Sequence, residues 1–235
     1  MSMNTSVRRG RVREPDTATT LAFRSGRDGI GLLALGPRTK ASYFALGEMP
    51  RFVTVRLRPG LAGPLLGVAM SELVDQAVHL REMWGRSAVT LMNRLAAEAD
   101  DAGLAGRLAA ALEERLAGIS AADAGRARTV QAAAGMLTGT AKVPEIAREL
   151  GVSERHLRNL FHDGVGLSPK HYARIHRVRG VLAGDRGEPW AELAATTGFY
   201  DQSHMSADFR SVMGVPPGAF RAGRFPALGR CAFRP

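Results

Sequence analysis

The 235-residue chain contains a single cysteine, Cys231, close to its C-terminus. One cysteine cannot build an intramolecular disulfide framework, a cysteine-based zinc site or an iron–sulfur site. The sequence also lacks any apolar run approaching the roughly 18–20 residues of a membrane helix, and its arginine-rich N-terminus lacks the apolar stretch of a secretory signal. These absences predict a protein of the reducing cytoplasm without a membrane partner.

Acidic side chains are fewer than basic ones: 22 Asp and Glu residues stand against 32 Lys and Arg residues, which gives a formal net charge of +10. Such an excess favours a polyanionic partner such as nucleic acid, although basic proteins without such a partner exist. The excess is spread over both halves of the chain, so charge alone does not locate a binding site.

Signatures of common enzymes are missing as well. The sequence has no G-x-S-x-G nucleophile elbow, no Walker loop and no dinucleotide-binding fingerprint. Five of the six histidines lie in the C-terminal half without the spacing of a carboxylate-backed metal site; they are His156, His162, His171, His176 and His204. We therefore predict that the protein is not an enzyme and expect no catalytic residue, no cofactor and no metal ion.

The N-terminal part of the chain divides by composition and periodicity. Residues 1–17 are polar and arginine-rich, which predicts a disordered basic arm. From residue 19 to residue 57, short apolar runs lie between Gly and Pro signals. Val53, Val55 and Leu57 alternate with polar neighbours, as in a strand. We expect about four short strands in this stretch.

The periodicity becomes helical from Ser71 onwards. A helix is predicted over residues 71–84 with Ser71 as its N-cap, and two more over 87–99 and 104–116. The apolar stripe of the last helix consists of Leu104, Leu108, Leu112 and Leu116. Such stripes usually face a core and less often form a dimer interface. The pattern predicts a small α+β domain over 18–118, in which short strands precede about three helices.

The C-terminal part begins after a change in composition. Residues 119–127 are small and polar and are predicted to be a linker between two domains. A further helix is expected over 128–140, at the start of a second domain that covers 128–223. Residues 224–235 are expected to be a C-terminal tail.

The segment VPEIARELGVSERHLRNLF, residues 143–161, predicts two helices joined by a tight turn. Pro144 suits the first turn of a helix, Gly151 ends that helix, and Ser153 can cap the next one. The small side chain of Ala147 allows the two helices to cross closely. A helix, a short glycine-containing turn and a second helix make up the helix-turn-helix arrangement.

The segment WAELAATTGFYDQSHMSADF, residues 190–209, repeats this pattern. Ala194 precedes Gly198 by four residues, the same spacing as in the first segment. Asp201 takes the capping position after a turn that is one residue longer. Between the two segments, residues 168–185 predict a basic connecting helix. Two such units in tandem are a much stronger signal than a single one.

Together these residues resemble the DNA-binding domain of the AraC/XylS family of bacterial transcription regulators. The resemblance covers about 40 % of the chain and rests on IARELGVSERHLRNLF, GLSPKHYARIHRVRGVL and LAATTGFYDQSHMSADFRSVMGVPPGAFR. It implies an all-α domain in which two helix-turn-helix units flank a linker helix and each places its second helix in a major groove. The implied protein is a cytoplasmic, sequence-specific regulator of double-stranded promoter or operator DNA.

The resemblance assigns DNA-contacting positions residue by residue. In the first unit they are Ser153, Arg155, His156, Arg158 and Asn159. In the second unit they are Gln202, Ser203, His204, Ala207 and Arg210. Arginine can pair with guanine and asparagine with adenine, while Arg210 is placed for a phosphate. Many family members carry a basic residue in place of Ala207, and Asp208 beside it adds negative charge. The second unit is therefore expected to bind less tightly, or to read shape and thymine methyl groups.

For the N-terminal domain the resemblance implies a cupin-like part. Many family members bind an effector in a cupin barrel and dimerise through helices. The roughly 40 residues of strand pattern are too few for a full eight-stranded barrel with a roomy cavity. We expect a short cupin-like remnant and a homodimer formed through residues 71–117, while a small-molecule effector has no specific support.

Besides a regulator that acts mainly through contact with RNA polymerase, which does not exclude DNA binding, two alternatives from other classes stay open. The net charge would also suit a non-specific architectural DNA-binding protein, although two shaped recognition helices argue for sequence reading. The other is an enzyme in which an AraC-type module is fused to a DNA-alkylation repair domain. Such an enzyme needs reactive cysteines, and Cys231 lies outside both predicted domains.

Overall fold

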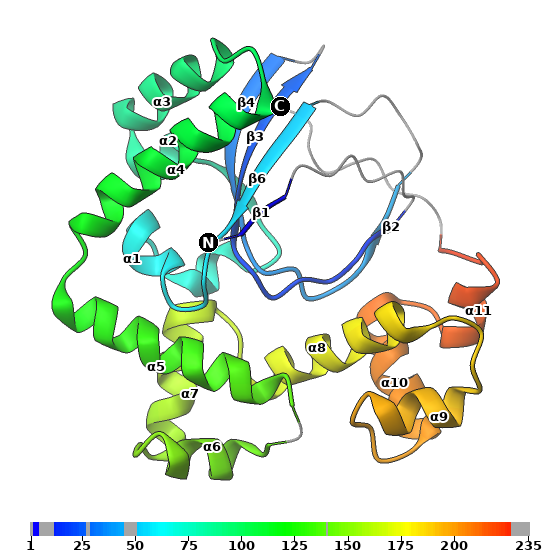
Figure 1. Cartoon of the computed structure of the whole chain (residues 1–235). Coiled ribbons are helices and arrows are strands. Elements are labelled where there is room, and N and C mark those ends of the chain that lie inside the picture. Colours follow the sequence, from blue (N-terminus) through cyan, green and yellow to red (C-terminus); the bar gives the residue numbers. More distant parts are fainter. Residues whose placement is uncertain (1, 5–11, 27–28, 45–50, 140, 227–235) are drawn as a thin grey trace.

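The computed structural model describes residues 2–4, 12–26, 29–44, 51–139 and 141–226. An N-terminal region of short strands and helices is followed by a C-terminal region whose described part is helical (Figure 1). The described strands are β1 (Ser2–Asn4), β2 (Val12–Arg13), β3 (Thr20–Gly26), β4 (Gly29–Leu35), β5 (Ser42–Tyr43), β6 (Arg51–Arg56) and β7 (Ala77–His79). The accompanying helices are α1 (Ala62–Leu66), the 3-10 helix η1 (Met70–Leu73), α2 (Arg81–Trp84), α3 (Arg86–Ala96) and α4 (Asp101–Ala117). The predicted fold class, mainly α with a small N-terminal α+β part, is confirmed.

Five of the strands form an antiparallel sheet in the order β1-β6-β3-β4-β7, and β2 pairs with β5. Strands β3 to β6 lie in the stretch predicted to hold about four strands, so that prediction is confirmed. Val53, Val55 and Leu57 are buried, whereas Thr54 and Arg56 between them are partly exposed. Helices α3 and α4 contact the sheet and complete the hydrophobic core of the N-terminal region.

The helix predicted over residues 71–84 is wrong, because the chain forms η1, β7 and α2 in succession. Asp75 has a φ of 59°, and its carboxylate accepts hydrogen bonds from the N–H and the hydroxyl of Thr39 at 2.7 and 2.5 Å. Strand β7 then pairs with β4 at the edge of the sheet. Leu80 and Trp84 are buried, so the apolar pattern identified core residues. The backbone of β7, just before Leu80, is satisfied by the sheet edge instead of a helix.

The helices predicted over 87–99 and 104–116 correspond to α3 and α4, with ends that shift by up to three residues. Asp100 caps α4 by accepting a hydrogen bond from the N–H of Gly103 at 2.7 Å. The stripe residues with no solvent exposure at all are Leu104, Leu108 and Leu112. The stripe is therefore part of the core of its own chain and is not free to form a dimer interface.

The prediction of a disordered arm over residues 1–17 is wrong for the residues that the structure describes. Strand β1 pairs with β6 and β2 pairs with β5. The carboxylate of Asp16 accepts hydrogen bonds from Nη1 and Nη2 of Arg56 at 2.6 and 2.8 Å, and from Nη1 of Arg179 at 2.8 Å. Burial acts to raise the pKa of Asp16, but Arg179 and Arg56 hold it below its ordinary value. Residues 5–11, the most arginine-rich part of the predicted arm, lie outside the described residues.

The C-terminal helices are α5 (Ala121–Leu137), α6 (Val143–Glu149), α7 (Glu154–Val165), α8 (Pro169–Gly184), α9 (Trp190–Thr196), α10 (Gln202–Met213) and α11 (Pro217–Arg221). Helix α5 begins inside the stretch predicted as a linker, 119–127, because Ser120 caps it by accepting a hydrogen bond from the N–H of Asp123 at 3.0 Å. Most of that stretch is therefore helical. Most of the predicted tail, including Cys231, lies outside the described residues.

The contact between Thr17 and α8 places a histidine in a poorly hydrated position. The hydroxyl oxygen of Thr17 lies 2.9 Å from Nε2 of His176, and the ring of Tyr172 stacks on the imidazole at 4.5 Å. Burial, reinforced by the charge of Arg179, lowers the pKa of His176 from 6.5 to about 4. The folded chain therefore keeps this imidazole neutral at pH values where the unfolded chain protonates it.

Acidification from pH 7 to pH 5 should lower the free energy of unfolding through His176 by about 1 kcal/mol, after allowance for its partial exposure. The lowered pKa means that the unfolded chain binds more protons in this window, so the contribution is present above pH 6.5 and is lost as pH falls toward 4. Urea unfolding at both pH values should show a smaller pH effect in His176→Gln than in the wild type. An identical pH effect in both proteins would mean that the imidazole is solvated in the folded state.

Candidate nucleic-acid interface

The first helix-turn-helix unit consists of α6 and α7 and has the geometry predicted from its sequence. Gly151 in the turn has a φ of 67°, a left-handed conformation that suits glycine. The N–H of Val152 donates to the carbonyl of Ala147 at 2.9 Å and closes the turn. The hydroxyl of Ser153 accepts a hydrogen bond from the N–H of His156 at 3.1 Å, so Ser153 caps α7.

The second unit, α9 and α10, reproduces these contacts. Gly198 has a φ of 79°, and the N–H of Phe199 donates to the carbonyl of Ala194 at 3.0 Å. The carboxylate of Asp201 caps α10 by accepting a hydrogen bond from the N–H of His204 at 2.7 Å. The cap comes one residue later than in the first unit, as the sequence predicts.

The two recognition helices, α7 and α10, have the same length of 12 residues and the same type of ending. Each is followed by a left-handed glycine, Gly166 with a φ of 80° and Gly214 with a φ of 75°. Their surroundings differ. A Cβ at Gly166 would lie 2.5 Å from the carbonyl oxygen of Met70, whereas a Cβ at Gly214 would meet nothing within 4 Å. The N-terminal region therefore packs tightly against the end of α7.

One continuous helix, α8, joins the units and lies between them in Figure 1. Ser168 caps it, as expected, by accepting a hydrogen bond from the N–H of His171 at 3.2 Å. Ile175 belongs to the hydrophobic cluster of the first unit, and Val178 belongs to the cluster of the second. The relative placement of the two recognition helices is therefore set by α8.

The predicted DNA-contacting side chains of the first unit lie together on the outer face of α7. The exposed residues are Ser153, Arg155, His156, Arg158 and Asn159. Leu157 and Leu160 face the core, as expected. Nη2 of Arg158 lies 2.6 Å from Oε2 of Glu154, in an exposed ion pair of small energetic value. Arg158 can therefore exchange this carboxylate for another acceptor at little cost.

The predicted residues of the second unit are exposed along α10 in the same manner. They are Gln202, Ser203, His204, Ala207 and Arg210. The negative charge of Asp208, expected beside Ala207, does not lie on this outer face. Its side chain is buried and lies 3.1 Å from Nε of Arg174 and 3.4 Å from Nη2 of Arg177, both on α8. The sequence could not reveal this pairing, because the partners are more than 30 residues away.

Tyr200 is a surface residue that the sequence reading did not select. It immediately precedes the cap of α10 and is 93 % exposed, the largest exposed fraction among the large hydrophobic residues of the described chain. An aromatic side chain left in solvent next to the exposed half of a recognition helix is available to a partner. The sequence signal that could have identified Tyr200 is its position in the turn, between Phe199 and the cap residue Asp201.

The N-terminal region contacts the C-terminal end of each recognition helix. The N–H of Gly60 donates to the carbonyl of Gly164 in α7 at 3.2 Å. The hydroxyl of Tyr43 donates to the carbonyl of Met213 in α10 at 2.6 Å, and burial raises the pKa of Tyr43 to about 12. These contacts hold the C-terminal ends and leave the N-terminal halves of both helices exposed.

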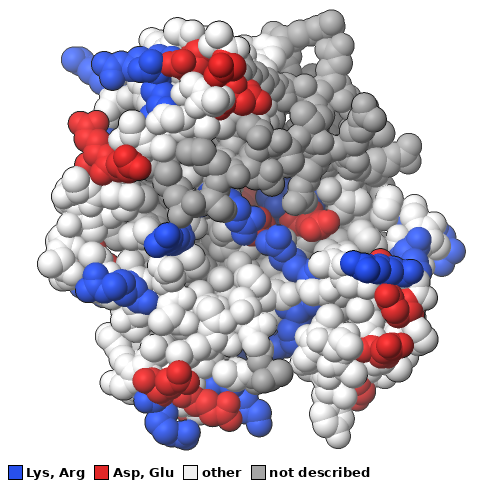
Figure 2. All heavy atoms as spheres, viewed as in Figure 1, with Lys and Arg blue, Asp and Glu red and all other residues white. Residues whose placement is uncertain are grey.

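The charge distribution on the surface is mixed. Figure 2 shows a broken line of Lys and Arg side chains down the middle of one face, with further basic groups at its edges beside acidic ones. This face therefore has no single continuous basic patch. The candidate interface is defined by the two recognition helices and not by net charge.

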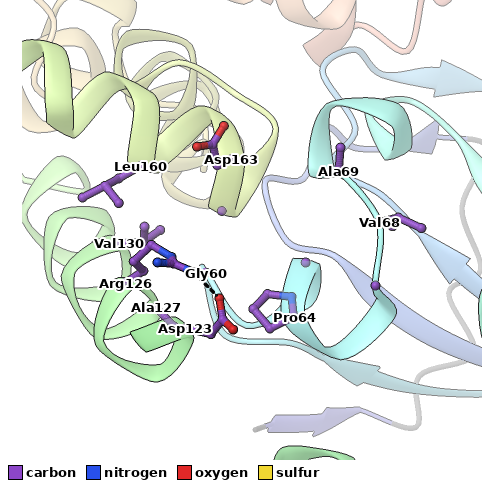
Figure 3. A pocket seen from close by; sticks show the side chains of 13 residues that line it. Gly60, Pro64, Val68, Ala69, Asp123, Arg126, Ala127, Val130, Leu160 and Asp163 are labelled. Atoms are coloured by element: carbon purple, nitrogen blue, oxygen red, sulfur yellow. Dashed lines mark hydrogen bonds and ion pairs between the residues drawn. The ribbon is translucent and has the colours of Figure 1, made fainter. Parts of the chain in front are cut away.

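A hollow of about 580 Å³ lies where the N-terminal region meets the first unit (Figure 3). Its walls come from the glycine-rich α1 segment, from α5 and from α7, which contributes Leu160, Asp163 and Gly164. Arg126 and Asp123 form an ion pair on the α5 side. The hollow thus adjoins the C-terminal half of α7, away from the exposed N-terminal half of that helix.

No group of three or more His, Cys, Asp or Glu side chains in the part of the chain that the structure describes is arranged to hold a metal ion. Within the same residues, no helix combines the length and apolar character needed to cross a membrane.

Comparison with known proteins matches residues 146–223 to a family described as a helix-turn-helix domain. No curated protein sequence matches the chain. The solved DNA-binding domain of AdpA, in complex with a target DNA, is 24 % identical over 42 % of this chain and 90 % of that one, with a TM-score of 0.37. An AraC-type regulator from Chromobacterium violaceum is 24 % identical over 43 % and 96 %, with a TM-score of 0.38. ToxT from Vibrio cholerae is 11 % identical over 89 % and 91 %, with a TM-score of 0.41.

The tandem units and the matched family define the class of the C-terminal region, which is an AraC-type helix-turn-helix domain. This assignment covers residues 146–223. The cupin-like character of the N-terminal region stays a prediction.

The two equivalent glycines allow a matched test of the contact between the N-terminal region and α7. Gly214→Ala should lower the free energy of unfolding by about 1 kcal/mol, the cost of a left-handed alanine. Gly166→Ala should lower it by at least about 2 kcal/mol, since its Cβ must also displace the carbonyl of Met70. Chemical denaturation measures both, and equal losses would show that Met70 is not held against the end of α7.

Proposed function

We propose that the protein is a sequence-specific transcription regulator whose two recognition helices enter successive major grooves on one face of double-stranded promoter or operator DNA. The observation that carries this proposal is the pair of equivalent units joined by one helix, with the N-terminal halves of α7 and α10 both exposed. The 16 residues of α8 make a stiff spacer of about 24 Å, of the same order as the ~34 Å between successive major grooves.

In the first unit, direct base reading is assigned to side chains on the outer face of α7. Arg155 and Arg158 can each donate two hydrogen bonds to guanine, and Asn159 can pair with adenine. His156 and the N-terminal cap residue Ser153 lie at the start of the helix, where phosphate contacts are favoured. Each good bidentate pair supplies about 1–3 kcal/mol of discrimination between bases.

In the second unit, the exposed residues are smaller and mostly uncharged. Gln202 can pair with adenine, Ser203 and His204 can hydrogen-bond to base edges, and Ala207 can contact a thymine methyl group. Arg210 is assigned to a phosphate. To this set we add Tyr200, whose exposed hydroxyl can donate to a phosphate oxygen beside the cap of α10.

The remaining parts of the proposal concern partners. We infer a bacterial regulator that acts in the cytoplasm, where its DNA is, and that contacts RNA polymerase from the promoter. A small-molecule effector stays a prediction. Any homodimer through residues 71–117 has to use the outer surface of α3 and α4, where Val89 is 41 % exposed, because the leucine stripe is buried.

The proposed function is tested by incubating the full-length protein with sheared genomic DNA of its source organism at about 150 mM salt and sequencing the retained fragments. Enrichment of a few sites that share a motif two major grooves long supports the proposal. Uniform retention would instead support the alternative, a non-specific architectural DNA-binding protein.

Two arginine variants separate base reading from phosphate binding. Arg158→Ala should reduce discrimination between the selected site and a site with a single mismatch by about 1–3 kcal/mol. Arg210→Ala should weaken binding to all sequences alike and reduce the salt slope by about 1. Fluorescence anisotropy titrations at several salt concentrations measure both. Equal effects of the two variants on matched and mismatched DNA would contradict this division of roles.

The oligomeric state is tested separately by size-exclusion chromatography with light scattering. We expect a dimer at micromolar concentration, and Val89→Glu should convert it to a monomer because it places a charge on the exposed face of α3. Exposed Thr90, which neighbours it, provides the control Thr90→Glu on the same helix. A monomer in the wild type at micromolar concentration would contradict the dimer.

A further inference from the structure

The second recognition helix carries a buried carboxylate that its DNA-reading face does not explain. Asp208 in α10 is 8 % exposed. Its Oδ1 lies 3.1 Å from Nε of Arg174, and its Oδ2 lies 3.4 Å from Nη2 of Arg177. Both arginines belong to α8, so the carboxylate ties the second recognition helix to the helix that joins the two units. A buried carboxylate with two cationic partners is a strong geometric constraint.

The same carboxylate also faces a residue of the candidate interface. Nε2 of His204 lies 3.6 Å from Oδ2 of Asp208, one helical turn away in α10. The ring of His204 meets the ring of Phe199 edge-on at 5.4 Å, and the guanidinium of Arg177 lies 5.2 Å from the centre of the Phe199 ring. His204, Asp208, Arg177 and Phe199 thus form a closed ring of contacts between the turn, α10 and α8.

The inner and outer members of this cluster differ in exposure. Asp208 is buried and Arg177 is partly buried, while 47 % of the His204 side chain and 44 % of the Arg174 side chain are exposed. The exposed members therefore reach the surface, His204 from the N-terminal half of α10 and Arg174 from α8. The buried carboxylate of Asp208 contacts the exposed donors His204 and Arg174. Buried contacts of this kind hold binding side chains in a fixed orientation.

We propose that Asp208 is a positioning residue for DNA recognition by the second unit, which holds α10 on α8 and orients His204 and Arg174 toward the DNA. This inference rests on the proposed function. It assigns Arg174 to the interface as a phosphate contact beside the second groove. It also makes the second unit a specific reader despite its small, mostly uncharged outer residues.

A different role for the same carboxylate has the opposite consequences. If Asp208 only neutralised Arg174 and Arg177, its removal would free two cations for phosphates. Binding to unrelated DNA would then tighten, and the salt slope would steepen by up to about 2. If Asp208 positions the helix, its removal blurs base preference in one half of the site.

The test compares two variants that each remove one negative charge from a recognition helix. Asp208→Asn removes the buried carboxylate, and Asp163→Asn is the matched control, because 78 % of the Asp163 side chain in α7 is exposed and its ion-pair partner, His162, is exposed as well. Affinities of both full-length variants are measured for every single-base variant of the site selected by the wild type, at two salt concentrations. Thermal unfolding of each variant verifies that it is folded.

For Asp208→Asn we expect about tenfold weaker binding to the selected site and loss of base preference only in the half contacted by the second unit. Asp163→Asn should keep the full preference profile and bind all sequences slightly more tightly. Arg174→Gln leaves Arg177 on the carboxylate. It should weaken binding to all sequences because a phosphate contact is lost, and it should also blur the same half by about threefold because one tie to Asp208 is lost. This loss of preference decides the matter if Asp208→Asn does not fold.

Two outcomes would overturn the inference. One is an unchanged preference profile in the folded Asp208→Asn variant, or in Arg174→Gln where only that variant folds. The other is tighter binding of Asp208→Asn to unrelated DNA with a steeper salt slope than that of the Asp163→Asn control. A wild type with no preferred motif would instead reject the proposed function itself and this inference with it.

Discussion

Ile175 and Val178 lie less than one turn apart on α8, yet each is fully buried in a different hydrophobic cluster. Neither helix-turn-helix unit can move relative to the other without bending this helix or leaving one of the cores. The separation and the rotation of the two recognition helices are therefore set by the length and pitch of a single α-helix. The proposed insertion of both helices into successive grooves depends on such a stiff connection.

The N-terminal region adds a second constraint on the same geometry. It reaches α7 through Gly60, α10 through Tyr43, and α8 through Asp16 and Thr17. All of its contacts with the recognition helices named here fall at their C-terminal ends. The halves that carry the candidate base-reading side chains remain exposed. The N-terminal region thus contacts α7, α8 and α10. A change in its packing would therefore alter the contacts of all three helices.

The features predicted correctly from the sequence depend on contacts within a few residues of the chain. The caps Ser153, Asp201 and Ser168 each satisfy a backbone N–H three residues away. The errors concern stretches whose partners are distant. Residues 77–79, inside the stretch predicted as a helix over 71–84, pair with a sheet edge, and Asp16 in the predicted arm pairs with an arginine 163 residues away. Local composition carries no information about such distant partners. It therefore predicted a helix over 71–84 and disorder over 1–17.

The candidate interface shows the same division at the level of single side chains. Helical periodicity was sufficient to separate the outward residues of α7 and α10 from the inward ones, because that choice depends only on position along a helix. It failed for Asp208, whose inward position places it against α8 and converts an expected repulsion of DNA into a tie between two helices. The sign of a charge in a sequence therefore predicts its effect on DNA binding only after its partners are known. For the second unit those partners are Arg174 and Arg177, and they make a weakly charged recognition helix a well-anchored one.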